Sequence, residues 1–451
     1  MMGQAEQKRA PRLRTLPPVP GWLPEYKLIE DADGLGDDRV AFALLLALRD
    51  LRLWAESTPE ERPRLLLPPN RDRGEAFAYA VENAEGIEDP LHDLSTIRAN
   101  PDHATGEVLS AACRRVSWWA HRRSLTCIAL LFAEASVRLA PATAASANLA
   151  GRMARLKGLP DRAESWFEYS VRIAGRDGNR NRSELIRGLL GKGTILREHG
   201  RLDEAKPVLD RAARLCAATR RHRLAAETHH DLYVLAVMLD SYAEAEMHML
   251  RALHHYPIHH SAIPGLIHDW CFLLVQQGYY LQAAALLQSS IPTIGRVEIQ
   301  LVSWGTLSRA AAGAGATGLY NEAVQHIEAL VARTQTYASA ALIQAANGTR
   351  FLGDWERALK LAMRAQEIAE TRGETEVLHE VKTVIASINA REPPLPIAAP
   401  PSGSVIEEIH ERLIALLQAR QRPKRRPVET SREREASGHL VPTRREITTE
   451  P

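Results

Sequence analysis

The sequence predicts an all-α protein, and three observations support this fold class. Aromatic residues make up only 5% of the 451 residues, while Ala, Leu, Arg and Glu recur along almost the whole length. Alternating runs rich in Val and Ile, which would indicate strands, are scarce. A pattern of large and small residues repeats along the middle of the chain. Because Ala and Leu favour helices and small side chains let helices approach closely, we expect packed helices.

The clearest unit of this pattern covers residues 189–212. Its characteristic positions are Leu189, Gly193, Leu196, Gly200, Leu202, Ala205, Leu209 and Ala212. In a helical hairpin, Gly193 and Ala205 would be small where the two helices cross, and Gly200 would let the chain turn. The leucines would fill the space around the crossing.

The second-helix part of this unit recurs along the chain. Its downstream positions are Tyr242, Ala245, Gly278, Tyr280, Ala283, Gly318, Tyr320, Ala323, Gly353, Trp355 and Ala358, and its upstream positions include Ala129, Gly158 and Ala163. The predicted crossing alanines are separated by 34, 42, 40, 38, 40 and 35 residues. This alignment places the turn of the sixth hairpin at Gly318.

At these spacings the units resemble the tetratricopeptide repeat family, whose repeat is about 34 residues long. The longer intervals indicate extended helices or longer loops, as in the variable repeats of bacterial sensor and regulator proteins. The resemblance implies a right-handed superhelical solenoid of about seven hairpins over residues 104–372, with the first helix of each hairpin lining a concave groove. It also implies a non-catalytic scaffold that binds another protein or an extended peptide there.

The first-helix positions expected to face the groove are Arg187, His230, Asp269, Trp304, Arg309 and Asn347. A second hypothesis remains open: the repeats could close around a small signal molecule or a peptide and control a separate effector. The longer repeat intervals favour this regulatory sensor. The lack of a recognisable DNA-binding helix-turn-helix counts against it.

Both ends of the chain differ from the repeats. Residues 1–35 begin with a basic, Pro-rich stretch and are expected to be flexible, whereas residues 36–103 predict an N-terminal helical cap with helices at 39–55 and 73–83. Residues 373–392 predict a capping helix, and residues 393–403 a Pro-rich linker. We expect a tail at 421–451 that is basic and disordered because it lacks apolar periodicity.

Residues 404–420 predict an amphipathic helix. Its apolar stripe consists of Ile406, Ile409, Leu413, Leu416 and Leu417. Such a helix could dock on a partner, form a dimer, or fold into the protein's own groove as an autoinhibitory plug. The oligomeric state stays open.

Two motifs suggest ligand chemistry, and neither predicts a cofactor or a metal. Residues 313–318 spell the dinucleotide-binding pattern G-x-G-x-x-G, but that site needs a preceding strand, and a helix is predicted there. Nine of the 17 histidines lie between His222 and His268, and His255 with His259 has the spacing of a metal-binding pair. Pro257 separates that pair, so solvated or groove-lining histidines are favoured, with pH-dependent ligand binding as an intermediate possibility.

The remaining motifs and the composition exclude several classes of protein. No P-loop, zinc-protease, nucleophile-elbow or kinase signature occurs, so no enzyme is predicted. The basic tail contains interspersed Glu residues and no aromatic residues, which favours a solvated tail over nucleic-acid binding. The chain has no run of 18 apolar residues, no signal-peptide pattern and no C-x-x-C pair among its four cysteines. These features predict a cytoplasmic protein without a membrane segment or a disulfide framework.

Overall fold

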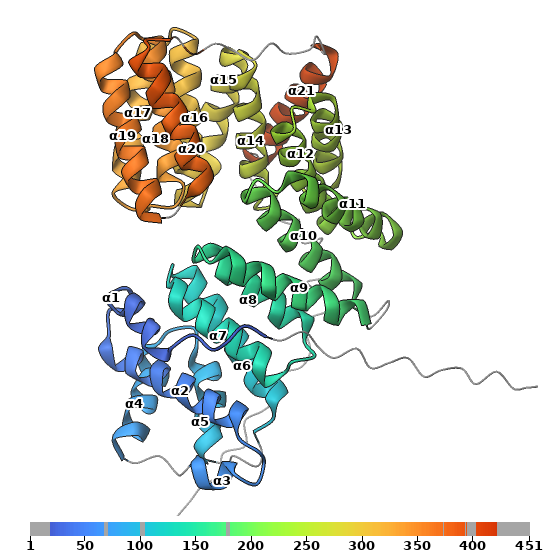
Figure 1. The fold of residues 1–451 in the computed structure, drawn as a ribbon, viewed down its shortest axis with the longest axis vertical. Helices are drawn as coiled ribbons and strands as arrows, with labels where there is room; N and C mark the ends of the chain where they lie inside the picture. The colour runs from blue at the N-terminus through green and yellow to red at the C-terminus, as the bar shows by residue number, and fades with distance from the viewer. Residues whose placement is uncertain are drawn as a thin grey trace, which may run out of the picture.

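A computed structural model describes residues 19–66, 71–99, 104–176, 181–372, 374–392, 394 and 403–421. Within these ranges the chain forms 21 α-helices and two 3-10 helices, and no strand. The all-α fold class is therefore confirmed. The helices follow one another from the blue N-terminal elements at the bottom of Figure 1, through α10 and α11, to α20 at the top. They form an extended stack of hairpins and do not close into one bundle.

Seven hairpins make up the repeats. Their first and second helices are α6 (Gly106–Arg122) and α7 (Thr126–Leu139), α8 (Ala144–Leu156) and α9 (Pro160–Arg176), α10 (Arg182–Glu198) and α11 (Leu202–Thr219), α12 (His222–Met238) and α13 (Tyr242–His255), α14 (Ile263–Gln276) and α15 (Tyr280–Ser290), α16 (Val297–Gly313) and α17 (Thr317–Val331), and α18 (Ala338–Phe351) and α19 (Trp355–Arg372). A short 3-10 helix, η2 (Ile291–Thr293), follows α15.

Each hairpin turns through three residues, one of which has a left-handed backbone. These residues are Ser124, Gly158, Gly200, Asp240, Gly278, Gly315 and Gly353, with φ between 53° and 84°. A left-handed residue ends one helix and redirects the chain, and glycine adopts this conformation without steric cost. The repeated glycines of the sequence therefore lie mainly in these turns.

Small residues lie where the two helices of a hairpin cross. In six hairpins the fourth residue of the second helix is an alanine that is at most 1% exposed, namely Ala129, Ala163, Ala205, Ala245, Ala283 and Ala358. On the opposite helix of the third hairpin, a Cβ atom at Gly193 would lie only 2.5 Å from Cδ2 of Leu209. Small side chains thus set the distance between the paired helices.

The sixth hairpin departs from the predicted register. Gly318 lies inside α17, and the turn residue is Gly315, with φ of 75°. The fourth residue of α17 is consequently Tyr320 and not Ala323. Tyr320 is fully buried, and its hydroxyl lies 2.6 Å from Oγ1 of Thr349 on α18. A tyrosine is accommodated at this position because its hydroxyl forms a hydrogen bond with Thr349. The turn predicted at Gly318 is wrong, because the observed turn lies three residues earlier, at Gly315.

The N-terminal helices pack on the first hairpin and share its hydrophobic core. They are η1 (Glu25–Asp31), α1 (Ala32–Leu35), α2 (Asp38–Glu56), α3 (Arg62–Leu65), α4 (Arg71–Asn83) and α5 (Glu88–Ala99). Both η1 and α2 contact α7, and α5 contacts α6. Leu44 and Leu51 of α2 are fully buried in this core. Burial of apolar side chains therefore attaches these helices to the repeats.

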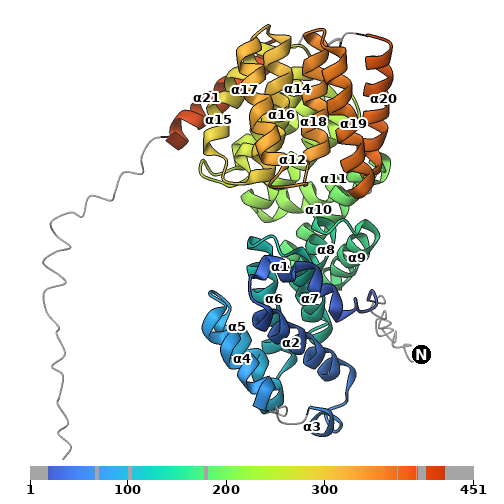
Figure 2. The same cartoon turned by 90° about the vertical axis from the view of Figure 1, so that its left-hand side faces the viewer.

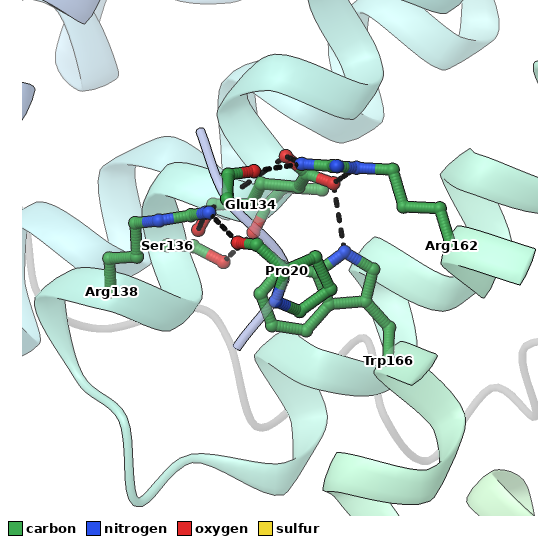
Figure 3. A network of polar contacts seen from close by, with 8 residues as sticks. Pro20, Glu134, Ser136, Arg138, Arg162 and Trp166 are labelled. Atoms are coloured by element: carbon green, nitrogen blue, oxygen red, sulfur yellow. Dashed lines mark hydrogen bonds and ion pairs between the residues drawn. The ribbon is translucent and has the colours of Figure 1, made fainter. Parts of the chain in front are cut away.

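The expectation of a flexible segment over residues 1–35 is wrong for residues 19–35, and residues 1–18 lie outside the described part. Two arginines hold the start of this segment by its backbone carbonyls (Figure 3): Arg138 of α7 donates to the oxygen of Pro20, and Arg162 of α9 donates to that of Gly21. The guanidinium carbon of Arg138 also lies 4.2 Å from the centre of the Trp22 ring. These side chains supply the partners that an isolated backbone segment lacks.

The C-terminal helices close the stack and then return along it. The first of them, α20 (Thr375–Asn389), packs on α19 and α18, whereas α21 (Gly403–Gln421) contacts α13 and α15. Figure 2 shows α21 beside α15 at the edge of the upper half. Because α13 and α15 are second helices, α21 does not occupy the first-helix face, and the expected alternative of a plug in the groove is not formed. The linker at 393 and 395–402 and the tail at 422–451 lie outside the described residues.

Candidate functional site: a polar face along the first helices

Polar side chains connect the first helices of neighbouring hairpins one after another. Between α8 and α10, Nδ2 of Asn148 donates to Oε2 of Glu184 at 2.9 Å. Between α10 and α12, the hydroxyl of Thr194 donates to Oδ2 of Asp231 at 3.1 Å. Each contact joins two hairpins through side chains and not through apolar packing alone.

The same pattern continues through the second half of the stack. Nε2 of His230 on α12 lies 2.7 Å from Oδ2 of Asp269 on α14. Two further contacts extend the row to α16 and α18: His268 lies 3.1 Å from the Thr306 hydroxyl, and Arg309 donates to Gln276 (3.3 Å) and Gln344 (3.1 Å). We define the polar ladder as Asn148, Glu184, Thr194, His230, Asp231, His268, Asp269, Gln276, Thr306, Arg309 and Gln344. It spans six consecutive first helices.

The carboxylate of Asp269 contacts both histidines of the ladder. Its Oδ2 contacts His230, and its Oδ1 lies 2.9 Å from Nδ1 of His268. Burial raises the pKa of Asp269. The hydrogen bonds and charges of His230 and His268 lower it by a larger amount, so the net pKa is below the ordinary value. The carboxylate therefore remains ionised and fixes both histidines.

Asp269, His268 and Thr306 are connected like a carboxylate, a base and a nucleophile. Such a relay needs a hydroxyl that a substrate can reach. Thr306 is only 1% exposed, so its hydroxyl is closed to substrates. The relay instead ties α14 to α16.

The six groove residues predicted from the sequence have different surroundings. His230, Asp269 and Arg309 belong to the ladder. Asn347 lies one turn beyond it on α18, where its Oδ1 accepts a 2.7 Å hydrogen bond from Arg350. Trp304 stacks on His326 of α17, with ring centres 4.1 Å apart, and thus packs within its own hairpin. Arg187 is exposed and pairs with Glu184.

We call the face formed by the first helices the inner face. Several of its polar residues were not predicted. Arg155 of α8 forms a 2.7 Å ion pair with Glu198 of α10. Tyr337, which precedes α18, is 44% exposed, yet burial raises its pKa, and the charges of Arg155 and Glu198 also act on it. Only coordinates could bring Tyr337 and Arg155 together, because they lie five hairpins apart in sequence, with four hairpins between them.

The histidine-rich stretch forms two close pairs within the fourth hairpin, of which His229 and His248 are stacked and His222 and His255 are tilted. Nδ1 of His229 lies 3.1 Å from Nδ1 of His248, and Nδ1 of His222 lies 3.3 Å from Nδ1 of His255. Burial lowers the pKa of His229 to about 4 and lowers those of His248 and His255 as well. Among the described residues, no three His, Cys, Asp or Glu side chains are arranged to hold a metal ion.

Neither motif that could have indicated a ligand adopts the required geometry. His255 is the last residue of α13, whereas His259 lies in the turn after it, so the two do not form a pair on one helix. Gly313 ends α16 and Gly315 forms a hairpin turn, so the G-x-G-x-x-G sequence follows a helix and not a strand.

No protein-family model and no curated protein sequence matches this chain. Among solved structures, this chain is similar to a Rap protein complexed with Competence and Sporulation Factor. The two share 14% identity with a TM-score of 0.46, and the match covers 75% of this chain and 99% of that chain. A Rap conjugation gene regulator of the plasmid pLS20, in complex with the Phr* peptide, shares 12% identity over 78% of this chain and 99% of its own, with a TM-score of 0.36.

A circular tandem repeat protein with novel repeat topology shares 16% identity over 87% of this chain and 90% of its own, with a TM-score of 0.17. At these values the fold assignment rests on the helices and turns described above. The chain has a tetratricopeptide-like repeat fold. None of its described helices combines the length and the apolar composition that crossing a bilayer requires.

Proposed function

We propose that this protein is a non-catalytic scaffold that binds an extended segment of a partner protein, or a peptide, along its first-helix face. The observation that carries this proposal is the polar ladder, which extends over six consecutive hairpins on the inner side of the stack.

An extended peptide is the ligand whose chemistry suits such a row. Its backbone presents N–H and C=O groups at each residue, about 3.3 Å apart, and these groups require partners when they leave water. The ladder offers carboxylate, imidazole, amide and guanidinium groups along one line. His230 and Asp269 remain accessible, with 18% and 32% of their side chains exposed.

The experiment is a selection of random heptapeptides on the full chain, followed by calorimetric titration of the selected peptides. We expect binding that weakens by about tenfold in the double variant His230→Ala/Asp269→Asn, because the first change removes an accessible polar group of the ladder and the second removes an accessible charge. The matched control is Arg172→Gln, an exposed position on the second helix α9. Equal binding by the double variant and wild type would contradict the proposal.

A further inference from the structure

Among the described residues, one arginine of the inner face forms no hydrogen bond or ion pair with a carboxylate. Arg152, on α8, is exposed, and within the described residues no carboxylate or carbonyl accepts a hydrogen bond from it. Burial lowers its pKa, the positive charges of Arg155, Arg296 and Arg223 lower it further, and the charge of Glu227 acts in the opposite direction. Arg152 is therefore accessible, partly removed from water, and near more positive than negative charge.

The three neighbouring arginines are each matched by a glutamate. Arg155 pairs with Glu198 at 2.7 Å, Arg223 pairs with Glu227 at 3.1 Å, and Arg296 donates to Glu298 at 2.8 Å. Each of these three glutamates is thus bound directly to another arginine, whereas none of them contacts Arg152 directly. A cation that has lost part of its hydration without gaining a counter-charge is unfavourable, and a bound anion would relieve this cost.

An aromatic ring holds Arg152 in position. Its guanidinium carbon lies 5.0 Å from the centre of the Trp118 ring on α6, and that ring is 37% exposed. His121 packs edge-on against Trp118, with ring centres 5.7 Å apart. A guanidinium over an aromatic face keeps its N–H groups at the edge, where a planar carboxylate can accept two of them.

We propose that Arg152, placed on Trp118, is the subsite of the inner face that binds a carboxylate of the peptide ligand. This inference rests on the proposed function and specifies the chemistry of the ligand: an extended peptide with a carboxylate next to a side chain that packs on the exposed part of the indole. The carboxylate belongs either to the C-terminus of the peptide or to an acidic side chain. The experiment separates these two sources.

The test uses the full chain and two heptapeptide libraries. One has free C-termini and contains Asp and Glu, and the other is amidated and lacks both residues. We expect the best ligands of the first library to bind at least tenfold more tightly than those of the second. Amidation of a selected peptide, compared with replacement of its Asp or Glu by Asn or Gln, then identifies the source of the carboxylate.

Substitutions locate the subsite. Arg152→Gln should remove the advantage of carboxylate-bearing peptides, and Trp118→Leu should reduce it. Arg172→Gln, on the outer helix α9, should leave it unchanged, and circular dichroism should show that all three variants are folded. Peptides that bind equally well without any carboxylate, or an advantage that persists in Arg152→Gln, would overturn this inference and leave the proposed function standing. Failure of both libraries to yield any ligand would overturn both.

Discussion

Nε1 of Trp166 on α9 donates a 2.8 Å hydrogen bond to the carboxylate of Glu134 on α7, which is only 1% exposed (Figure 3). Nη2 of Arg162 lies 2.6 Å from the same carboxylate, and Nη1 of Arg138 lies 3.9 Å from it. Since the same two arginines hold the carbonyls of Pro20 and Gly21, Glu134 links the first two hairpins to the start of the described chain.

Glu134→Gln should therefore lower the free energy of unfolding by about 3 kcal/mol, because it leaves two largely buried arginines without their counter-charge. The matched control is Glu164→Gln on α9, whose partner Arg201 is 42% exposed. That variant should lose less than about 1 kcal/mol. Urea unfolding of both variants checks this, and equal losses would show that the buried charge is not essential.

The two glycines at the sixth turn should respond oppositely to substitution. Gly315→Ala should destabilise the protein by about 1 kcal/mol, because alanine disfavours the left-handed backbone at φ of 75°. Gly318→Ala should be neutral or stabilise by up to about 1 kcal/mol, because Gly318 is helical and no atom lies within 4 Å of the added Cβ. Thermal unfolding measures both changes. If Gly318→Ala destabilised the protein more than Gly315→Ala, the turn would lie at Gly318, as the sequence predicts.

These residues illustrate how far the sequence determines the fold. The spacing of small residues predicted the helical hairpins, because an alanine or glycine at a crossing is a local steric requirement. It could not decide between Gly315 and Gly318, since either glycine can form a turn and the choice depends on how Tyr320 meets Thr349 of the next hairpin.

The site was less predictable than the fold. The repeat register alone indicates that His230, Asp269 and Arg309 lie on first helices, where they take part in the ladder contacts, and their role in ligand binding stays a prediction. The contact between Trp118 and Arg152 joins two hairpins, and the influence of Arg155 on Tyr337 joins residues that lie five hairpins apart. Such relationships depend on the curvature of the whole stack, which no local pattern encodes.

Helix α21 should contribute to stability and not to ligand binding. Leu413 is fully buried against the cluster around α13 and α15, whereas its neighbour Ile414 is 38% exposed. Leu413→Ala should cost about 2 to 5 kcal/mol, and Ile414→Ala less than about 1 kcal/mol. Urea unfolding measures both losses.

Deletion of residues 393–451 should likewise lower the unfolding midpoint, and it should leave the affinity for selected peptides unchanged, because α21 lies on second helices. Tighter peptide binding by the truncated chain would show that α21 also reaches the inner face.

Stability should fall as the pH falls from 7 to 4, in part because of the stacked histidines. Burial, together with the charges of His248, Arg251 and His255, lowers the pKa of His229 from an ordinary value near 6.5 to about 4. Between these two pH values the unfolded chain binds more protons than the folded chain, so the free energy of unfolding decreases as the pH decreases. The expected loss is about 1 to 3 kcal/mol, since solvent screening reduces the full effect.

His229→Gln should flatten this pH dependence, because glutamine does not titrate and can keep a polar contact with His248. The control is His379→Gln on the exposed side of α20, which should leave the slope unchanged. The measurement is the free energy of unfolding in urea at several pH values between 4 and 7.5. The lowered pKa of Asp269 also makes the free energy of unfolding depend on pH, but only near and below about pH 4, where carboxylates begin to protonate. A change in the free energy of unfolding between about pH 5 and 6.5 is therefore attributable to the histidines. An unchanged slope in His229→Gln would show that burial of this imidazole does not oppose its protonation.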